Sequence, residues 1–337
     1  MTLGLHVYST CPHRLEAGGA TYAAAVADAA RWSEEAGYEG MLIYAANEAP
    51  ADPWLLAQIV VQATRGLSPL VATNPLYMHP FTAAKLVASI ASLYGRRTDL
   101  NLIAGGFAND LAAFADATDH DGRYRRLSEY VAILEALLQA DRPVSFAGEF
   151  YRTDRMKLAA PPPAELRPRL FVSGSSSASF DFAHLVGAIS LHYPTFAEED
   201  EPEAASDLQS GVRLGIVTRP DGEAAWRVAR ARFPNDRRGE VRHMLAMSVS
   251  DSVWHKRLSA LDECAEAAPN PFWLGPFQND QDYAPYLVGD YDTVGKALAL
   301  LIRGGRRWFI VNAPPDADEA QHVRAAFARA ETFAGAS

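Results

Sequence analysis

Residues 170–177 read LFVSGSSS, and this short stretch contains both halves of one strand–helix unit. The apolar run at 170–172 is typical of a buried strand. The small polar turn at 173–176 is typical of the start of a helix, because serines favour capping positions. A buried strand that passes directly into a helix is the building block of a parallel α/β fold.

The same unit recurs along the whole chain. Strands are expected at residues 3–9, 40–45, 67–73, 100–104, 170–173, 188–192, 211–218 and 308–312. Helices are expected at residues 21–36, 52–64, 80–94, 123–139, 175–186, 196–209, 223–233, 293–303 and 318–333. Eight strands alternating with helices predict an α/β fold in which residues 1–337 form a single (β/α)8 TIM-barrel domain. A doubly wound open sheet is the alternative, but its glycine-rich loop is missing after the first strand, where STCPH stands at 9–13.

Two segments depart from the simple alternation. Residues 143–158 resemble a β-hairpin, with Gly148 and Glu149 near the turn. Residues 220–289 form an insertion that is too long for a plain connection. Insertions of this length are typical of lids and binding loops, so we expect this one to cover the site.

The composition limits the classes of function. The chain has 337 residues, 49% of them hydrophobic, and a formal net charge of −10. Apolar content of this size favours a globular protein, and the negative charge argues against nucleic acid as a partner. No membrane span or signal peptide is expected, and the two cysteines, Cys11 and Cys264, fit a reducing cytoplasm without disulfides. No metal site is expected, because metal-binding motifs are missing from the sequence.

In a barrel of this kind the site lies where the strands end. The turn Ser173, Gly174, Ser175 and Ser176 offers hydroxyls and backbone N–H groups at a helix start, an arrangement that favours an anion such as phosphate. A plain serine cap without a ligand explains the same turn equally well. The stretch DHDGRY at 119–124 is a second candidate for anion binding, but a solvated helix start explains it more simply.

Further candidates lie in or just after other strands. Arg213 stands in an apolar strand, where a charge needs either an ion-pair partner or an anionic ligand. His6 and His192 also lie within strands, and either is a candidate general base because histidine titrates near neutrality. Tyr44 and Tyr193 follow strands and predict a partly apolar substrate with one polar group.

Several stretches, taken in order, match one family. They are EEAGYEGMLI at 34–43, NLIAG at 101–105, DH at 119–120, RY at 123–124, GSS at 174–176, GVRL at 211–214, LVGD at 287–290 and TV at 293–294. Through them nearly the whole chain resembles the bacterial luciferase-like flavin-dependent monooxygenases, most closely the alkanesulfonate monooxygenase branch.

The resemblance implies a flavin enzyme. Reduced FMN (FMNH2) would come from a separate flavin reductase, and O2 would form a peroxyflavin that oxygenates a small organic substrate. A homodimer or homotetramer is also implied. By position, Asn101 would face the flavin ring, His120 and Tyr124 would lie near the ribityl phosphate, and residues 174–176 would hold it. Arg213 would lie near the substrate or the peroxyflavin.

The chain departs from the alkanesulfonate pattern at four places. Gly215 replaces a histidine, NEAPA at 47–51 has no cysteine, and NAPP at 312–315 has no tyrosine. PFQNDQDY at 276–283 has two acids and no arginine. Fewer cationic groups weaken the binding of a sulfonate, so we expect a different substrate. Two alternatives share the fold: an F420-dependent hydride-transfer oxidoreductase and a non-catalytic flavin-binding barrel.

Overall fold

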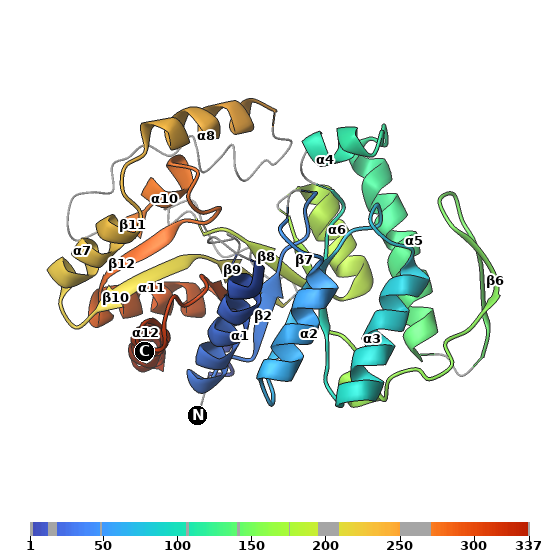
Figure 1. Cartoon of the computed structure of the whole chain (residues 1–337), viewed down its shortest axis with the longest axis horizontal. Helices are drawn as coiled ribbons and strands as arrows, with labels where there is room; N and C mark the ends of the chain where they lie inside the picture. Colours follow the sequence, from blue (N-terminus) through green and yellow to red (C-terminus); the bar gives the residue numbers. More distant parts are fainter. Residues whose placement is uncertain are drawn as a thin grey trace.

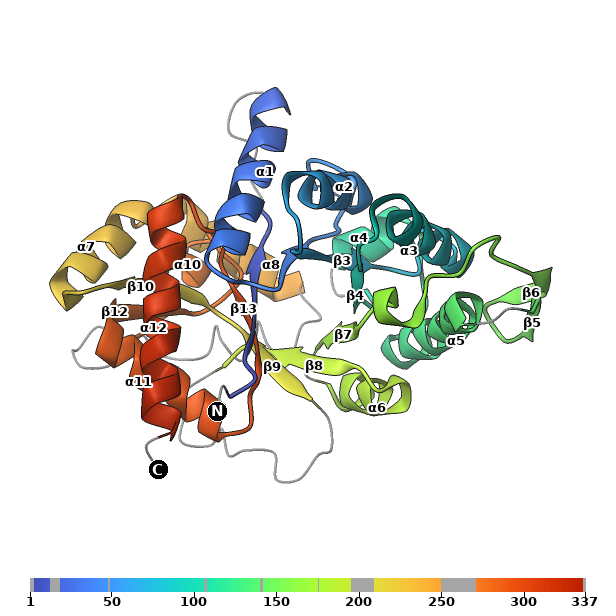
Figure 2. The same cartoon turned by 90° about the horizontal axis from the view of Figure 1, so that it is seen from below.

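The computed structural model describes residues 3–12, 19–47, 49–105, 108–139, 142–174, 176–194, 209–249 and 271–335. Eight parallel strands close into a barrel, as the sequence predicts (Figures 1 and 2). Their order around the barrel is β1 (His6–Thr10), β13 (Trp308–Val311), β9 (Ser210–Arg213), β8 (Ile189–His192), β7 (Leu170–Ser173), β4 (Asp99–Leu102), β3 (Ser68–Thr73) and β2 (Gly40–Ile43).

Helices cover the outside of the barrel. They are α1 (Gly19–Glu35), α2 (Pro53–Ala63), α3 (Pro80–Tyr94), α4 (Ala108–Ala113), α5 (His120–Gln139), α6 (Ser177–Val186), α11 (Tyr291–Arg303) and α12 (Ala317–Gly335). Local signals place their ends: Asp52 caps α2 by accepting the N–H of Trp54, and Gly95 ends α3 in the left-handed region at φ 64°. No described helix is long and apolar enough to cross a membrane.

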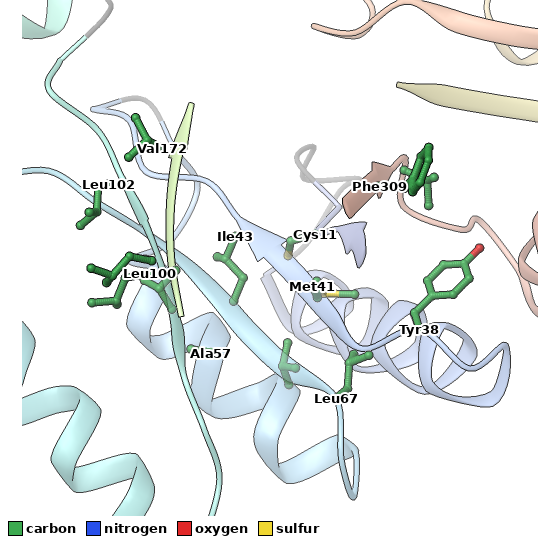
Figure 3. Close-up of a cluster of buried hydrophobic side chains, with 14 of the residues drawn as sticks. Cys11, Tyr38, Met41, Ile43, Ala57, Leu67, Leu100, Leu102, Val172 and Phe309 are labelled. Carbon is green, nitrogen blue, oxygen red and sulfur yellow. The ribbon is translucent and has the colours of Figure 1, made fainter. Parts of the chain in front are cut away.

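Alternate residues of each strand face opposite sides of the barrel wall. In β2, Leu42 joins the cluster that fills the barrel interior, whereas Met41 and Ile43 join the layer beneath the helices. Figure 3 shows Met41, Ile43 and Leu67 within this outer layer of buried side chains. Two apolar layers on either side of one sheet therefore form the core of the barrel.

The strand expected at 211–218 is two strands, which corrects the prediction. β9 ends at Arg213, and β10 (Gly215–Arg219) leaves the barrel to pair with β12 (Tyr286–Asp290). A Cβ at Gly215 would lie 2.2 Å from the ring of Tyr286, so glycine allows this close approach. Both strands are buried, so the sequence shows one continuous apolar run and gives no sign of the break between β9 and β10.

The long insertion contains a small sheet of its own. β10, β12 and β11 (Phe272–Trp273) form this sheet, to one side of the barrel in Figure 1. The insertion also contributes α7 (Gly222–Arg232), α8 (Arg237–Val249) and α10 (Gly275–Gln278). The expected hairpin is confirmed as β5 (Val144–Ala147) and β6 (Arg152–Met156), on the opposite side. The helix expected at 196–209 falls almost entirely outside the described residues.

Charged and aromatic side chains fill the end of the barrel where the strands begin. The Tyr8 hydroxyl donates to Asp99 over 2.9 Å, and Arg169 donates to the same carboxylate over 2.8 Å. Arg169 also bonds Glu39, which in turn bonds His6 at 2.7 Å. Buried ions need partners of this kind, so the network closes this end of the barrel.

Candidate functional site

Arg213 is the last residue of β9 and lies at the opposite end of the barrel, where the strands finish. Its guanidinium Nη2 donates to Asp282 over 3.4 Å, and the two side chains are 11% and 8% exposed. The rings of Tyr44 and Tyr193 lie 5.3 Å and 5.9 Å from the guanidinium carbon. We call Arg213, Asp282, Tyr286, Tyr44 and Tyr193 the arginine cluster.

The insertion places Asp282 in this cluster. Its carboxylate accepts the Tyr286 hydroxyl at 2.5 Å and the Tyr283 backbone N–H at 2.6 Å. Tyr286 begins β12, and this strand is held beside β10 directly after Arg213. The break between β9 and β10 therefore brings an acidic partner from the small sheet to the end of the barrel.

Burial and charge shift the pKa values within the arginine cluster. Burial alone would lower the pKa of Arg213, but Tyr44, Tyr193 and Asp282 together raise it. Burial raises the pKa of Tyr44, and burial together with Asp282 raises that of Tyr286. At neutral pH the cluster therefore holds a charged guanidinium and neutral phenols.

Two donors of Arg213 have no partner among the described residues. Its Nε and Nη1 atoms are buried, and no hydrogen-bond acceptor reaches them in the described part of the chain. A buried N–H group without an acceptor costs about 1–3 kcal/mol, and more when it is charged. The cluster is therefore suited to a ligand that brings a hydrogen-bond acceptor.

A second group of polar side chains surrounds Gly174, at the start of α6. A Cβ at Gly174 would lie 2.5 Å from the Ser179 hydroxyl and 3.2 Å from the Tyr124 hydroxyl. The Ser179 side chain is fully buried, and its hydroxyl has no partner among the residues that the structure describes. Ser176 caps α6 by accepting the Ser179 backbone N–H. We call Gly174, Ser176, Ser179 and Tyr124 the glycine cradle.

The cradle has the features of an anion site. The free N–H groups of a helix start carry partial positive charge, and glycine lets the Ser179 and Tyr124 hydroxyls approach the backbone closely. The orphan hydroxyl of Ser179 offers a further donor at the same place. His120 lies in the first turn of α5, with its ring 5.2 Å from that of Tyr124, and bonds Asp121 at 3.0 Å.

Asn101 and Ser173 lie on the neighbouring strands β4 and β7, and Ser173 directly precedes Gly174 of the cradle. The Ser173 hydroxyl donates to the Asn101 side-chain oxygen over 3.0 Å, and Asn101 is 4% exposed. Ser175, the remaining residue of the predicted turn, lies outside the described residues. The structure therefore places Asn101, Ser173, Gly174, Ser176 and Tyr124 along one part of the barrel.

The two strand histidines lie at opposite ends of the barrel. His6 is the first residue of β1, bonds Glu39 and stacks on Trp308 at 3.8 Å. It belongs to the network at the far end of the barrel, because the strand begins later than the sequence predicts. His192 ends β8, where burial, and then the charge of Arg306, lower its pKa to about 3. It is therefore neutral near pH 7 and is a weak base.

Sequence reasoning missed three residues of these clusters. Asp282 appears in the sequence only as one of two acids in the stretch at 276–283, and Tyr286 and Ser179 have no local motif. An ion-pair partner for Arg213 is foreseeable from its apolar strand, but its position in the chain is not. No group of three or more potential metal ligands occurs among the described residues.

Comparison with known proteins defines the class. The model of the luciferase-like monooxygenase family matches residues 3–307. The chain is also 34% identical over 275 residues to the 4-(gamma-L-glutamylamino)butanoyl-(BtrI acyl-carrier protein) monooxygenase BtrO of Niallia circulans, covering 80% of each chain. This chain belongs to the luciferase-like monooxygenase family and is an enzyme of that family.

Solved structures share the fold. A long-chain alkane monooxygenase (LadA) has a TM-score of 0.75 at 14% identity, covering 100% of this chain and 97% of the other. An F420-dependent secondary alcohol dehydrogenase has a TM-score of 0.67 at 16% identity, covering 97% and 99%. At these identities the likeness concerns the fold alone. The family predicted from the sequence is confirmed, and the alkanesulfonate branch stays a prediction.

Proposed function

We propose that this protein is a monooxygenase that uses FMNH2 and O2 to oxygenate a small organic substrate. The glycine cradle is the observation that supports FMN most directly. It combines a helix start, a glycine that lets two hydroxyl-bearing side chains approach the backbone, and a buried hydroxyl without a partner among the described residues. A phosphate monoester satisfies all three, because its oxygens accept several hydrogen bonds and its negative charge suits the helix start.

The residues of this chain would bind the cofactor and the substrate in two separate clusters. Gly174, Ser176 and Tyr124 would hold the phosphate, with His120 beside them. Asn101 and Ser173, already bonded to each other, would meet the flavin ring. Arg213 would bind the substrate's polar group between the rings of Tyr44 and Tyr193. When bound, the reduced flavin supplies the electrons that activate O2.

The buried surroundings of Arg213 have a second role. Tyr44, Tyr193 and the insertion surround the guanidinium and leave it 11% exposed. A site from which water is excluded protects reactive oxygen species from hydrolysis and strengthens electrostatic contacts. We assign no proton transfer to His6, because of its position, or to His192, because of its low pKa.

The cofactor F420 is the alternative, because one solved structure with the same fold is that of an F420-dependent secondary alcohol dehydrogenase. F420 also carries a phosphate group, so the cradle alone does not separate the two cofactors. The family assignment favours oxygenation over hydride transfer. A non-catalytic flavin-binding barrel does not agree with membership of an enzyme family.

The partners follow from this proposal. A separate flavin reductase would deliver FMNH2, and the working form would be a homodimer or homotetramer. The BtrO relative is named for a substrate bound to an acyl-carrier protein, so a carrier-bound acyl chain is a further substrate candidate here. An alkanesulfonate is a weaker candidate, since Asp282 offsets the charge of Arg213.

Anaerobic titration with FMNH2 tests the proposal. We expect saturable binding, followed by O2 consumption when air is admitted, and weaker binding of FMNH2 by Tyr124→Phe. Tyr77→Phe is the matched control, because the Tyr77 hydroxyl donates to Asp110 instead of approaching the cradle. Binding of reduced F420 without binding of FMNH2 would overturn the proposal in favour of hydride transfer.

A further inference from the structure

We propose that the arginine cluster selects substrates whose polar group is an uncharged hydrogen-bond acceptor, such as the carbonyl of an amide, ester or thioester. Free carboxylates and sulfonates would be excluded, and Asp282 would be the residue that excludes them. This inference rests on the proposed function in one respect, namely that the substrate binds at Arg213.

The charge of Arg213 is already balanced inside the protein. Its Nη2 atom donates to Asp282, and both side chains are almost fully buried. Tyr286 and the Tyr283 backbone N–H hold the carboxylate in place by two further hydrogen bonds. None of the three tyrosines of the cluster adds charge at neutral pH, because burial raises the pKa values of Tyr44, Tyr193 and Tyr286. The described side chains of the cluster therefore sum to zero charge.

An anionic ligand would disturb this balance. A carboxylate bound at Nε or Nη1 would lie on the same guanidinium as Asp282, so two negative charges would share one buried positive charge. Charges of like sign repel strongly where water is excluded, and an unbalanced buried charge loses its hydration. A carbonyl oxygen accepts the same hydrogen bonds without adding charge.

The two orphan donors make an acceptor necessary. The Nε and Nη1 atoms of Arg213 are buried without a partner in the described residues, so an apolar ligand would leave them unsatisfied. The flanking rings of Tyr44 and Tyr193 favour apolar or planar groups on either side of that acceptor. The cluster thus fits a polar carbonyl within an otherwise apolar molecule.

Calorimetric titration with two matched probes, hexanamide and hexanoate, tests this inference at pH 7 on the full chain, with and without FMN. We expect the wild type to bind hexanamide at least tenfold more tightly than hexanoate. Asp282→Asn keeps one acceptor oxygen in place of the two that serve Tyr283 and Tyr286, and it gives the cluster a net positive charge. We expect this variant to reduce the preference at least tenfold, mainly through tighter binding of hexanoate.

Asp280→Asn is the matched control, because it removes a negative charge two residues away, where Asp280 pairs with Arg242 near the surface. Asparagine also tolerates the φ of 55° at this position. We expect this variant to keep the wild-type preference. The wild-type ratio is an independent test if Asp282→Asn does not fold.

Three results would overturn the inference: equal or tighter binding of hexanoate by the wild type, an unchanged preference in folded Asp282→Asn, or binding of neither probe at millimolar concentration. The proposed function fails by a different measurement, the absence of FMNH2 binding in anaerobic titration. The two failures are therefore distinguishable.

Discussion

The substitution Gly174→Ala tests the glycine cradle most directly. The added Cβ would lie 2.5 Å from the Ser179 hydroxyl, 3.0 Å from the Ser179 Cβ and 3.2 Å from the Tyr124 hydroxyl. Ordinary contacts between such atoms are about 1 Å longer than the shortest of these distances, so the start of α6 or the Tyr124 ring must move. Overpacking of this kind costs about 1–3 kcal/mol.

The same movement would weaken phosphate binding. Loss or lengthening of one hydrogen bond to a charged group costs about 1.5–3 kcal/mol, which is roughly a 10- to 100-fold rise in Kd. We therefore expect at least tenfold weaker FMNH2 binding in Gly174→Ala, measured by anaerobic titration of flavin absorbance.

Gly66→Ala is the matched control, because a Cβ there meets only the Glu34 carboxylate at an ordinary 3.6 Å. This variant should bind FMNH2 as the wild type does. Wild-type affinity in a folded Gly174→Ala protein would refute the assignment of the cradle to the phosphate.

Three further predictions concern other parts of the molecule. Asp99→Asn should lower the free energy of unfolding, measured in urea, by about 3 kcal/mol, because it breaks a buried ion pair. Asp28→Asn, which breaks an exposed pair, should change the same free energy by less than about 1 kcal/mol. Equal effects of the two substitutions would contradict the argument. Because burial lowers the pKa of His192 to about 3 in the folded state, from its ordinary value of 6.5, the folded state binds fewer protons between these values. Stability should thus rise with pH from 4 to 6.5, by up to about 1.4 kcal/mol per pH unit, and His192→Asn should flatten this slope in urea unfolding at several pH values. Gly215→Ala should weaken hexanamide binding at least tenfold by displacing Tyr286, while the affinity for FMNH2 stays within twofold of the wild-type value. An equal loss of affinity for both ligands would show that the small sheet does not act on the substrate alone.

Patterns local in sequence predicted most of the barrel. The run at 170–172 alternates with helix signals in the way that parallel strands require, and β7 spans the expected residues Leu170–Ser173. The exit of β10 from the barrel was not predictable in this way. Burial on both faces produces the same apolar run whether a strand stays in the barrel or pairs with another sheet.

The same distinction between local and distant sequence signals applies to the candidate site. The turn around Gly174 was visible because a helix start depends on neighbouring residues, so its capping serine lies three positions from Ser179. The partner of Arg213 was not visible, because Asp282 is 69 residues away and reaches it only through the pairing of two strands. His6 was misplaced for a related reason: a shift in where β1 begins moves a side chain from one end of the barrel to the other.

The network of Tyr8, Asp99, Arg169 and Glu39 has a consequence for the order of events during turnover. Because it closes the end where the strands begin, the proposed flavin, the substrate and O2 would all have to enter at the end where Arg213 and Gly174 lie. Molecules that use the same entrance cannot pass each other inside the site. The occupant bound most deeply must then arrive first and depart last, so steady-state kinetics should follow a compulsory sequence, with binding of one ligand slowing the escape of the other.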